Sequence, residues 1–509
     1  MRRHVLALAL AAVLLGGCAT RAATSGPSKV DIPVADGSHP GRRGAPSTAR
    51  QTAPPSGASK ESPFPHVAHF TLANGLTVAI VPSRALPIVQ ARLLVHVGSA
   101  DGASPALATL TAELLKEGGT RALSSGELVR RIETLGSSLG ITTGADATVL
   151  AMPLTKDQVS EGLSLLSQVV REPRFDEGEL RKTKARAVDS AEEAARGDGA
   201  FASLHLVFRE LYPDRSGYAS WGLLPSQITK IDGAAIRELH RRFYVPKAST
   251  LVLAGDLDEA EGKALAERHF GTWTGGDRPR TERAAPRLPA RTRVIIAHRP
   301  KSAQSDVTIA TLGPARSAEG WPAVRVANQV LGGGIASRLF GDVREQRGLA
   351  YVTEARAYEL ASGEQPILVH AATETAKTSL AATALLENLA RMVAAPPSSS
   401  ETEAARAYVS DVFAIRMESL ASIADLVVLQ DEFGLPDGAW DAYRKQLRAI
   451  EPSQVEAAAK KLYPVEKVLV VVAGDADVVA ADLAKLGDVT VVDPEKEFKT
   501  MRTIPQAAK

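Results

Sequence analysis

The sequence is poor in cysteine and in net charge, and each shortage excludes a class of protein. One cysteine in 509 residues rules out an internal disulfide framework. Lysine and arginine total 60 and aspartate and glutamate total 58, so the formal net charge of +2 does not favour nucleic acid or an acidic partner. Hydrophobic residues, by contrast, make up 45% of the chain, which is enough for sizeable cores. The length predicts two or three domains.

The single cysteine follows an N-terminal secretory signal. Two arginines precede an unbroken apolar run at residues 5–15, which is too short to span a membrane as a stable helix. The run leads into Leu-Gly-Gly-Cys, ending at Cys18, which resembles a bacterial lipobox. The resemblance implies a signal peptide at 1–17, cleavage before Cys18, and acylation of its thiol and new amino group. Because Ala19 and not an aspartate follows, we expect a lipid-anchored protein on the periplasmic side of the outer membrane. A plain signal peptide with an incidental cysteine is the alternative.

A tether precedes the folded part of the chain. Residues 18–62 are rich in Ala, Ser, Pro, Gly and Arg and contain almost no large apolar side chains, so they cannot offset the entropy of ordering and are predicted to be flexible.

A hairpin pattern around Asn-Gly follows at 70–83. An apolar-periodic helix at 105–117 ends at a glycine pair. The further strands and helices do not form a βαβ repeat, which predicts an α+β fold with antiparallel strands.

An internal repeat indicates that this fold is present twice. Residues 228–258 align without a gap with residues 447–477, at an offset of 219 residues. Both segments contain a helix, an aromatic residue, a helix breaker, an apolar strand and then Gly-Asp. The repeat predicts two similar domains joined by a surface linker. The expected segments are 63–276 for the first domain, 277–291 for the linker, 292–492 for the second domain and 493–509 for a tail.

One stretch of the second domain carries a recognisable signature. Residues 328–358 contain Leu-Gly-Gly-Gly, Ser-Arg-Leu-Phe, Arg-Glu and Arg-Gly-Leu-Ala-Tyr in that order. The stretch resembles the second-half signature of the insulinase/pitrilysin metallopeptidases, the inverzincins, and the similarity extends over about residues 66–480. The resemblance implies two homologous α+β domains of the insulinase and mitochondrial-processing-peptidase type, each an antiparallel-rich sheet packed with helices. It also implies that two such chains close around a peptide-sized chamber.

The helix of the first domain departs from the family pattern at the metal site. In the family this helix carries His-x-x-Glu-His, and the aligned positions here are Leu110, Glu113 and Leu114. A further family ligand, a glutamate about eighty residues downstream, matches Glu192. A catalytic zinc usually has three protein ligands, and leucine has no lone pair to offer. The resemblance therefore implies a degenerate metal site, in which Glu113 and Glu192 either are ordinary helix-surface glutamates or keep a residual role.

The ten histidines offer no obvious replacement ligands. His66 and His69 form the only pair close in sequence, at a strand entry without a nearby carboxylate. The remaining histidines are isolated, and a lone histidine is far more often structural or solvated than a ligand. These are His4, His39, His96, His205, His240, His269, His298 and His370. We therefore predict no catalytic zinc in this chain.

The second domain keeps the residues that reach toward substrate in the family. Arg344 and Tyr351 are seven positions apart, as in the family's arginine–tyrosine pair. An arginine fork can grip a peptide carbonyl, and a tyrosine hydroxyl can donate to a developing oxyanion. The alternative is that Arg344 forms a surface ion pair and Tyr351 packs.

A glycine run precedes this pair. Gly332, Gly333 and Gly334 lead into a helix expected to start near Ile335. Glycines permit close backbone approach, and a helix N-terminus presents free amides, so the run is a candidate contact for substrate backbone. A packing constraint is an equal alternative. The P-loop lysine and spacing are missing, which excludes a phosphate loop.

Together these features predict a subunit and not a complete enzyme. In the family, the arginine–tyrosine pair of one unit completes the zinc site of another across the chamber. The chain is therefore expected to serve a homologous zinc-bearing partner in a heterodimeric periplasmic metallopeptidase that acts on peptides or unfolded proteins. Zinc is expected in the partner, no cofactor in this chain, and no nucleic-acid partner. A pseudopeptidase that binds peptides or scaffolds a complex is the alternative, and an independent enzyme with an unrecognised site is a third possibility.

Overall fold

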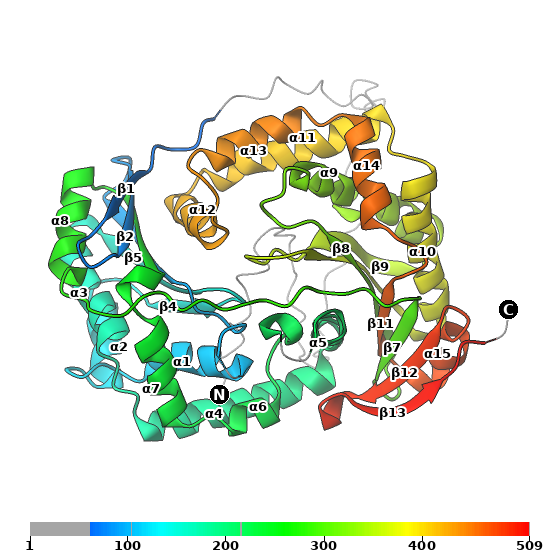
Figure 1. Cartoon of the computed structure of the whole chain (residues 1–509), viewed down its shortest axis with the longest axis horizontal. Helices are drawn as coiled ribbons and strands as arrows, with labels where there is room; N and C mark the ends of the chain where they lie inside the picture. Colours follow the sequence, from blue (N-terminus) through cyan, green and yellow to red (C-terminus); the bar gives the residue numbers. More distant parts are fainter. Residues whose placement is uncertain (1–61, 103, 214–215, 508–509) are drawn as a thin grey trace, which may run out of the picture. The chain divides into compact units, whose positions relative to one another are not determined.

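The computed structural model describes residues 62–507 apart from residue 103 and residues 214–215, and the described residues from Pro63 onward belong to one compact unit (Figure 1). The predicted signal peptide, Cys18 and nearly all of the tether lie outside the described residues. Among the helices that the structure describes, none is both long and apolar enough to cross a membrane.

The first half is built on a six-stranded mixed sheet. Its strands are β1 Ala68–Thr71, β2 Thr77–Pro82, β3 Ile88–Val95, β4 Gly140–Thr143, β5 Thr148–Thr155 and β6 Ser249–Gly255. Their order across the sheet is β1-β2-β6-β3-β5-β4. β1 and β2 form the predicted hairpin, with Thr71 opposite Thr77 and Gly75 at φ +90° in the turn. β6 is buried along its whole length, as expected of a continuous apolar strand at the centre of a sheet.

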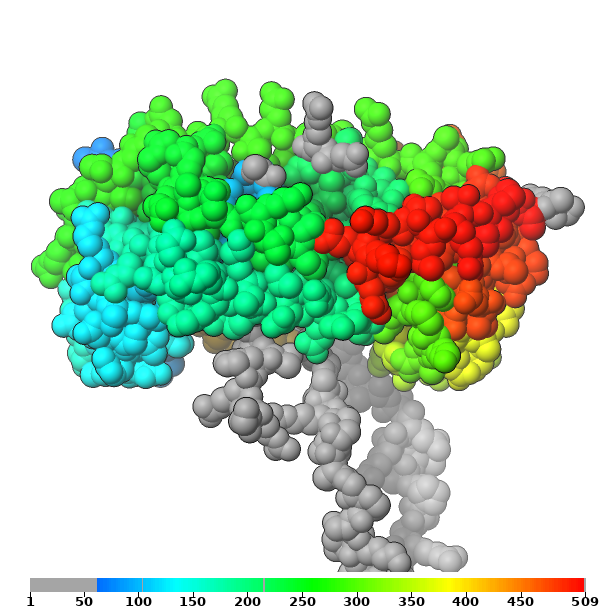
Figure 2. Space-filling view, turned by 90° about the horizontal axis from the view of Figure 1, so that it is seen from below, coloured from blue at the N-terminus to red at the C-terminus, as the bar shows by residue number. Residues whose placement is uncertain are grey.

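The second half is built on a seven-stranded mixed sheet. Its strands are β7 Arg293–His298, β8 Gln304–Gly313, β9 Ala350–Ala357, β10 Gln365–Glu374, β11 Leu469–Gly474, β12 Asp488–Asp493 and β13 Lys499–Ile504, and their order is β13-β12-β7-β11-β8-β10-β9. β13 lies within the segment expected as a tail and pairs with β12 at the sheet edge, and the red C-terminal part of the chain lies on the surface in Figure 2. Its side chains are almost all exposed, so it lacks the apolar alternation that marks a strand in sequence.

The two sheets repeat one topology. Five neighbouring strands of each sheet correspond in order: β2-β6-β3-β5-β4 in the first sheet and β7-β11-β8-β10-β9 in the second. In each, the first pair is parallel and the following pairs are antiparallel. Gly255 and Gly474 end the equivalent strands β6 and β11, as the offset of 219 residues predicts. The predicted fold, two similar α+β domains with antiparallel-rich sheets, is confirmed.

Most helices pack within their own half around two separate apolar cores. Those of the first half are α1 Pro105–Glu117, α2 Ser125–Thr134, α3 Val159–Arg171, α4 Glu177–Gly197, α6 Pro225–Thr229, α7 Gly233–Phe243 and α8 Glu259–Phe270. Those of the second half are α9 Trp321–Gly332, a π-helix Phe340–Gln346, α10 Thr378–Ala394, α11 Ser399–Arg416, α13 Ala439–Arg448, α14 Pro452–Leu462 and α15 Ala476–Leu483. Short 3-10 turns occupy Lys156–Gln158, Gly217–Ala219, Pro246–Ala248, Thr375–Lys377 and Pro494–Lys496.

Two helices are exchanged between the halves. α5 (Gly199–Leu211) follows α4 in the first half but packs on β8 and β11 of the second sheet, and Figure 1 shows it beside β11. α12 (Leu420–Glu432) follows α11 in the second half but packs on β3 and β6 of the first sheet. Phe208 on α5 is 2% exposed, and Val427 on α12 is 2% exposed in a cluster with Val252 of β6. Each sheet therefore has an apolar face on which a helix of the other half packs.

Candidate active site

The helix that aligns with the family's metal helix forms where the sequence predicts it. Ser104 caps α1 by accepting a backbone N–H, Pro105 is its first residue, and Gly119 at φ +75° follows its end. Leu110 and Leu114 are 0% and 1% exposed and pack in the first-half core. The two positions that hold histidines in the family thus contribute apolar contacts here.

The two glutamates expected near the metal position face different surroundings. Glu113 is half-buried on α1, and burial raises the pKa of its carboxyl above the usual range, although nearby Lys116 opposes the rise. Glu192 on α4 is exposed, whereas the preceding Ala191 is 7% exposed and packs in the core cluster that contains both leucines. In the described part of the chain, no group of three or more potential metal ligands includes either glutamate.

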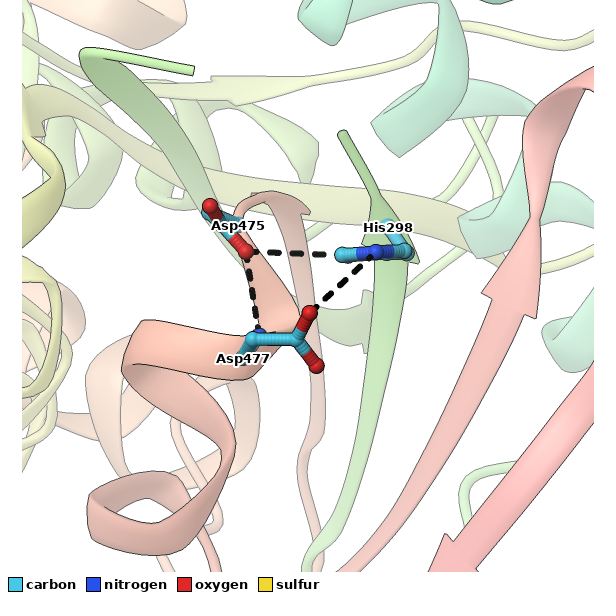
Figure 3. Close-up of side chains that lie close together, drawn as sticks. All are labelled: His298, Asp475 and Asp477. Atoms are coloured by element: carbon cyan, nitrogen blue, oxygen red, sulfur yellow. Dashed lines mark hydrogen bonds and ion pairs between the residues drawn. The ribbon is translucent and has the colours of Figure 1, made fainter. Parts of the chain in front are cut away.

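One group of described side chains has the composition of a metal site: His298, Asp475 and Asp477 (Figure 3). Its hydrogen bonds are those of a helix cap. Asp475 accepts the Asp477 N–H at 3.1 Å on one oxygen and a loop N–H at 2.7 Å on the other. His298 Nδ1 accepts the Ala476 N–H at 3.1 Å, so Nε2 carries the proton of the neutral ring. Arg502 pairs with Asp477 at 2.6 Å. With these partners in place, the group stabilises the start of α15.

The other described histidines also have structural partners. The expectation that His66 and His69 lack a nearby carboxylate is wrong, because His66 lies 3.3 Å from Glu259 and His69 lies 3.2 Å from Asp437. Their two carboxylates come from distant parts of the chain, so the pair does not share one site. The remaining contacts are His96 with Asp431, His205 with the Trp221 carbonyl, His240 with the Val170 carbonyl, His269 with Ser160 and His370 with Asp306.

We expect the purified chain to retain far less than one zinc per molecule. Both histidine positions of the metal helix are occupied by buried leucines, and the potential ligands around His298 are engaged in a helix cap. Elemental analysis after extensive dialysis measures the metal content, and His298→Ala should leave it unchanged. One tightly held zinc per chain would contradict this prediction.

Arg344 projects from an irregular helical turn. Phe340–Gln346 form a π-helix, a conformation that is frequent at functional sites. Arg344 is exposed, and its guanidinium carbon lies 4.7 Å from the centre of the Phe340 ring. A Glu345 carboxylate oxygen lies 3.9 Å from the Arg344 Nε, which is too far for a hydrogen bond. The ring restrains the guanidinium, and its N–H groups have no hydrogen-bond acceptor among the residues that the structure describes.

A buried carboxylate fixes the π-helix from the opposite side. Asp342 is 9% exposed and accepts hydrogen bonds from Arg347 at 3.1 Å, Asn388 at 2.7 Å and Arg391 at 2.5 Å. Although burial acts to raise it, these donors hold the pKa of Asp342 below its usual range. The network ties the segment that carries Arg344 to α10.

A second ion pair ties the same segment to α11. Arg338 donates to both carboxylate oxygens of Glu401, at 2.7 and 3.0 Å. These hydrogen bonds lower the pKa of Glu401 to about 2. The ion pairs to α10 and α11 therefore hold the backbone segment that carries Arg344.

Tyr351 lies near the start of the edge strand β9, which packs against the π-helix. The side chain is 51% exposed, and its hydroxyl donates to Oε1 of Gln304, the first residue of β8, at 3.2 Å. Because Gln304 is neutral and exposed, this bond can be exchanged for one to a substrate oxygen. Sequence reasoning missed Gln304, since no motif marks it and only the folded sheet places it beside Tyr351.

The glycine run lies at the end of one helix and not at the start of the next. α9 ends at Gly332, and Gly333 is its C-cap. The next helical turn begins three residues later than the expected start near Ile335, so that expectation is wrong; glycine favours helix C-termini as well. A Cβ at Gly332 would lie 2.4 Å from the Ala355 nitrogen of β9, so packing accounts for this glycine. Gly334 is exposed and remains a candidate contact for substrate backbone.

Gly332→Ala is expected to lower the free energy of unfolding by about 1–3 kcal/mol, because the added methyl would displace β9. Gly341→Ala is the matched control in the neighbouring π-helix, where a Cβ would meet nothing within 4 Å. The control should change stability by no more than about 0.5 kcal/mol. Urea unfolding of both variants measures the difference, and equal losses would contradict the packing role.

Two family models match these domains. Residues 77–206 match the model described as insulinase (peptidase family M16), and residues 230–409 match the one described as peptidase M16 inactive domain. The chain belongs to the insulinase, or M16, peptidase family. The second match includes Arg344 and Tyr351, so both lie in an M16 domain of the inactive type.

Several relatives of this M16 chain are named as zinc proteases. An uncharacterized zinc protease of Mycobacterium leprae is 28% identical over 292 residues, which is 56% of this chain and 64% of that protein. One of Streptomyces coelicolor is 27% identical over 297 residues, 56% of this chain and 63% of that protein. Mitochondrial-processing peptidase subunit beta of Blastocladiella emersonii is 27% identical over 205 residues, 39% of this chain and 43% of that subunit. The matches therefore span less than two thirds of these relatives.

Solved structures share the fold over most of the M16 chain. The crystal structure of a peptidase M16 inactive domain from Pseudomonas fluorescens matches with a TM-score of 0.74 and 26% identity, covering 80% of this chain and 98% of that one. A protease from Helicobacter pylori matches with a TM-score of 0.72 and 19% identity, covering 81% of this chain and 100% of that one, which shows the fold alone. Leu110 and Leu114 lie in the segment that matches the insulinase model, whereas Arg344 and Tyr351 lie in the segment that matches the inactive domain.

Proposed function

We propose that this M16 chain is the non-zinc subunit of a heterodimeric periplasmic zinc metallopeptidase. The observation that carries the proposal is a contrast within one chain. Leu110 and Leu114 occupy both histidine positions and are buried, whereas Arg344 and Tyr351 are exposed inside an otherwise intact signature. The match to an inactive-type M16 domain supports a non-catalytic role for the chain alone.

In this proposal the two subunits hold complementary parts of one site. A homologous partner would hold zinc through its His-x-x-Glu-His motif, and the bound metal would supply an activated water and Lewis-acid polarisation of the cleaved carbonyl. In this chain, Arg344 grips a carbonyl oxygen of the bound peptide through its N–H groups. The Tyr351 hydroxyl leaves Gln304 and donates to the reacting carbonyl oxygen as that oxygen gains charge. The substrates are peptides or unfolded proteins.

Reconstitution tests the proposal. The purified chain is mixed with a homologous subunit that carries His-x-x-Glu-His, for example one encoded by a neighbouring gene, and peptide cleavage is followed. Each subunit should be inert alone and active in the mixture. A partner that cleaves at the full rate by itself would contradict the proposal. A mixture that assembles without gaining activity would favour the second candidate, a pseudopeptidase that binds peptides or scaffolds a complex.

We also propose that Cys18 anchors the protein to the outer membrane. Cys18→Ala should move the protein from the membrane fraction to the soluble periplasmic fraction. Stable anchoring needs more than one acyl chain, since a single chain binds only marginally. Ala19→Asp is the matched control, which should keep the anchor but shift the protein to the inner membrane. A Cys18→Ala protein that still fractionates with membranes would count against the lipid anchor.

A further inference from the structure

Tyr351 is the extra residue of a β-bulge. Ala372 and Thr373 are neighbours on β10, but their partners on β9 are two positions apart, and Tyr351 is the residue between those partners. A bulge bends its strand and re-aims the side chains beside it, and bulges are frequent next to active sites. The bulge, and not the regular alternation of side chains along β9, therefore sets the direction in which the Tyr351 hydroxyl reaches Gln304.

Thr373 lies beside the bulge and bonds the chain just before it. Its side chain is 0% exposed, and its hydroxyl donates to the Leu349 carbonyl at 2.5 Å. The Glu374 carbonyl lies farther from the hydroxyl, at 3.4 Å. A hydroxyl has a single proton to donate, so the Leu349 carbonyl is its main acceptor. This hydrogen bond extends the contact between β10 and the chain by one residue beyond Ala350, where the pairing with β9 ends.

Leu349 links this hydrogen bond to the π-helix. Its N–H donates to the Val343 carbonyl at 2.9 Å, and its carbonyl accepts from Thr373. Both backbone polar groups of Leu349 are thus engaged, two residues before Tyr351 and directly after Gly348, which is at φ +59°. The Leu349 side chain also packs against the second-half core. These contacts together fix where the chain leaves the π-helix and enters the bulge.

We propose that Thr373 is a positioning residue of the candidate active site. Its hydroxyl holds the Leu349 carbonyl and thereby the bulge that points the Tyr351 hydroxyl toward a substrate oxygen. The inference rests on the proposed function and adds to it a residue outside the signature at 328–358. Arg344 has separate support from α10 and α11, so loss of the Thr373 hydroxyl should affect Tyr351 more than Arg344.

Kinetics of the reconstituted heterodimer test this position. Thr373→Val keeps the shape of the buried side chain and removes the hydroxyl. We expect kcat to fall about tenfold, less than when the Tyr351 hydroxyl itself is removed, and KM to change by less than about twofold. Thr373→Ser keeps the hydroxyl and should restore kcat. In a Tyr351→Phe heterodimer, Thr373→Val should lower kcat by less than about twofold further, because both substitutions act on one interaction.

Thr148→Val is the matched control in the first-half sheet. Thr148 on β5 is also 0% exposed, and its hydroxyl donates to the Val97 carbonyl at 2.8 Å, so the control removes an equivalent buried hydrogen bond. Urea unfolding should show similar losses of stability for Thr148→Val and Thr373→Val. Only Thr373→Val should lower kcat, which separates the position of Tyr351 from stability.

Fluorine NMR of the isolated chain, labelled with 3-fluorotyrosine, tests the same point without the partner subunit. The chain has eight tyrosines, and the resonance that is missing from Tyr351→Phe belongs to Tyr351. Thr373→Val should shift this resonance, Thr373→Ser should restore it, and Thr148→Val should not move it. The shift reports the surroundings of the ring in the folded chain, which a uniform loss of stability does not change.

Three results would overturn the inference. These are a Tyr351 resonance that Thr373→Val leaves in place, a loss of kcat no larger than that of Thr148→Val, and a loss that persists undiminished in the Tyr351→Phe background. Each would show that Thr373 only stabilises the sheet edge. A mixture with the partner that never gains activity counts against the proposed function, whereas NMR of the isolated chain still decides whether Thr373 positions Tyr351.

Discussion

A heterodimer carrying Tyr351→Phe is expected to turn over peptides about 10²–10³ times more slowly than the wild-type heterodimer, the loss typical of a single oxyanion donor. The substitution removes one hydroxyl and keeps the ring, which is 51% exposed, so folding and assembly should not change. Because the hydroxyl bonds a charge that develops only in the transition state, kcat should fall and KM should stay nearly constant. Steady-state kinetics of the reconstituted pair provide the measurement.

Arg344→Ala separates binding from chemistry at the same site. In the proposed site Arg344 also contacts the carbonyl in the ground state, so this variant should raise KM in addition to lowering kcat. Arg130→Ala, on an exposed face of α2, is a control for the loss of charge. Size-exclusion chromatography should show normal assembly for all variants. Wild-type cleavage rates in assembled Tyr351→Phe and Arg344→Ala heterodimers would refute the shared site and favour a scaffold.

Phe208→Ala is expected to lower the free energy of unfolding by about 3–5 kcal/mol. The Phe208 ring on α5 is 2% exposed and lies 5.1 Å from the Trp221 ring and 5.6 Å from the Tyr358 ring of the second half. Phe208 belongs to the first half in sequence, but α5 covers β8 and β11. The substitution should therefore also destabilise the second sheet. Hydrogen exchange should therefore accelerate in α5 and in both strands.

Phe270→Ala is the matched control for this coupling. Phe270 on α8 is 0% exposed and packs in the first-half core. Phe270→Ala should lower the free energy of unfolding by a similar amount, but it should accelerate hydrogen exchange mainly in the first half. Unchanged hydrogen exchange in β8 and β11 of the Phe208→Ala variant would show that α5 does not couple the two halves.

The sequence predicted correctly those elements whose structure depends on residues close together in the chain. The Asn-Gly turn of the first hairpin, the capped helix at 105–117 and the repeat at an offset of 219 residues all reappear in the structure. In each case a turn residue, a helix stop or an apolar period determines the outcome within a short window. The leucines at the two histidine positions, Leu110 and Leu114, were likewise readable from the sequence, through the resemblance of this helix to the family's metal helix.

Features that depend on distant contacts were not readable from the sequence. The apolar pattern of α5 shows that a face is buried but not against which sheet, so its exchange with α12 could not be predicted. Glycines occur at the ends of helices as well as before their starts, so the glycine run led to a wrong expected helix start near Ile335.

The burial of Leu110 and Leu114 makes the loss of the metal site difficult to reverse in evolution. Restoring histidine at both positions would place two polar rings where the exposed fractions are 0% and 1%. Each unsatisfied polar group there costs about 1–3 kcal/mol, against a typical total stability of about 5–15 kcal/mol. Glu192 would still face solvent, so a third ligand would be missing. The leucines that stabilise the first-half core therefore occupy the positions that a metal site would need.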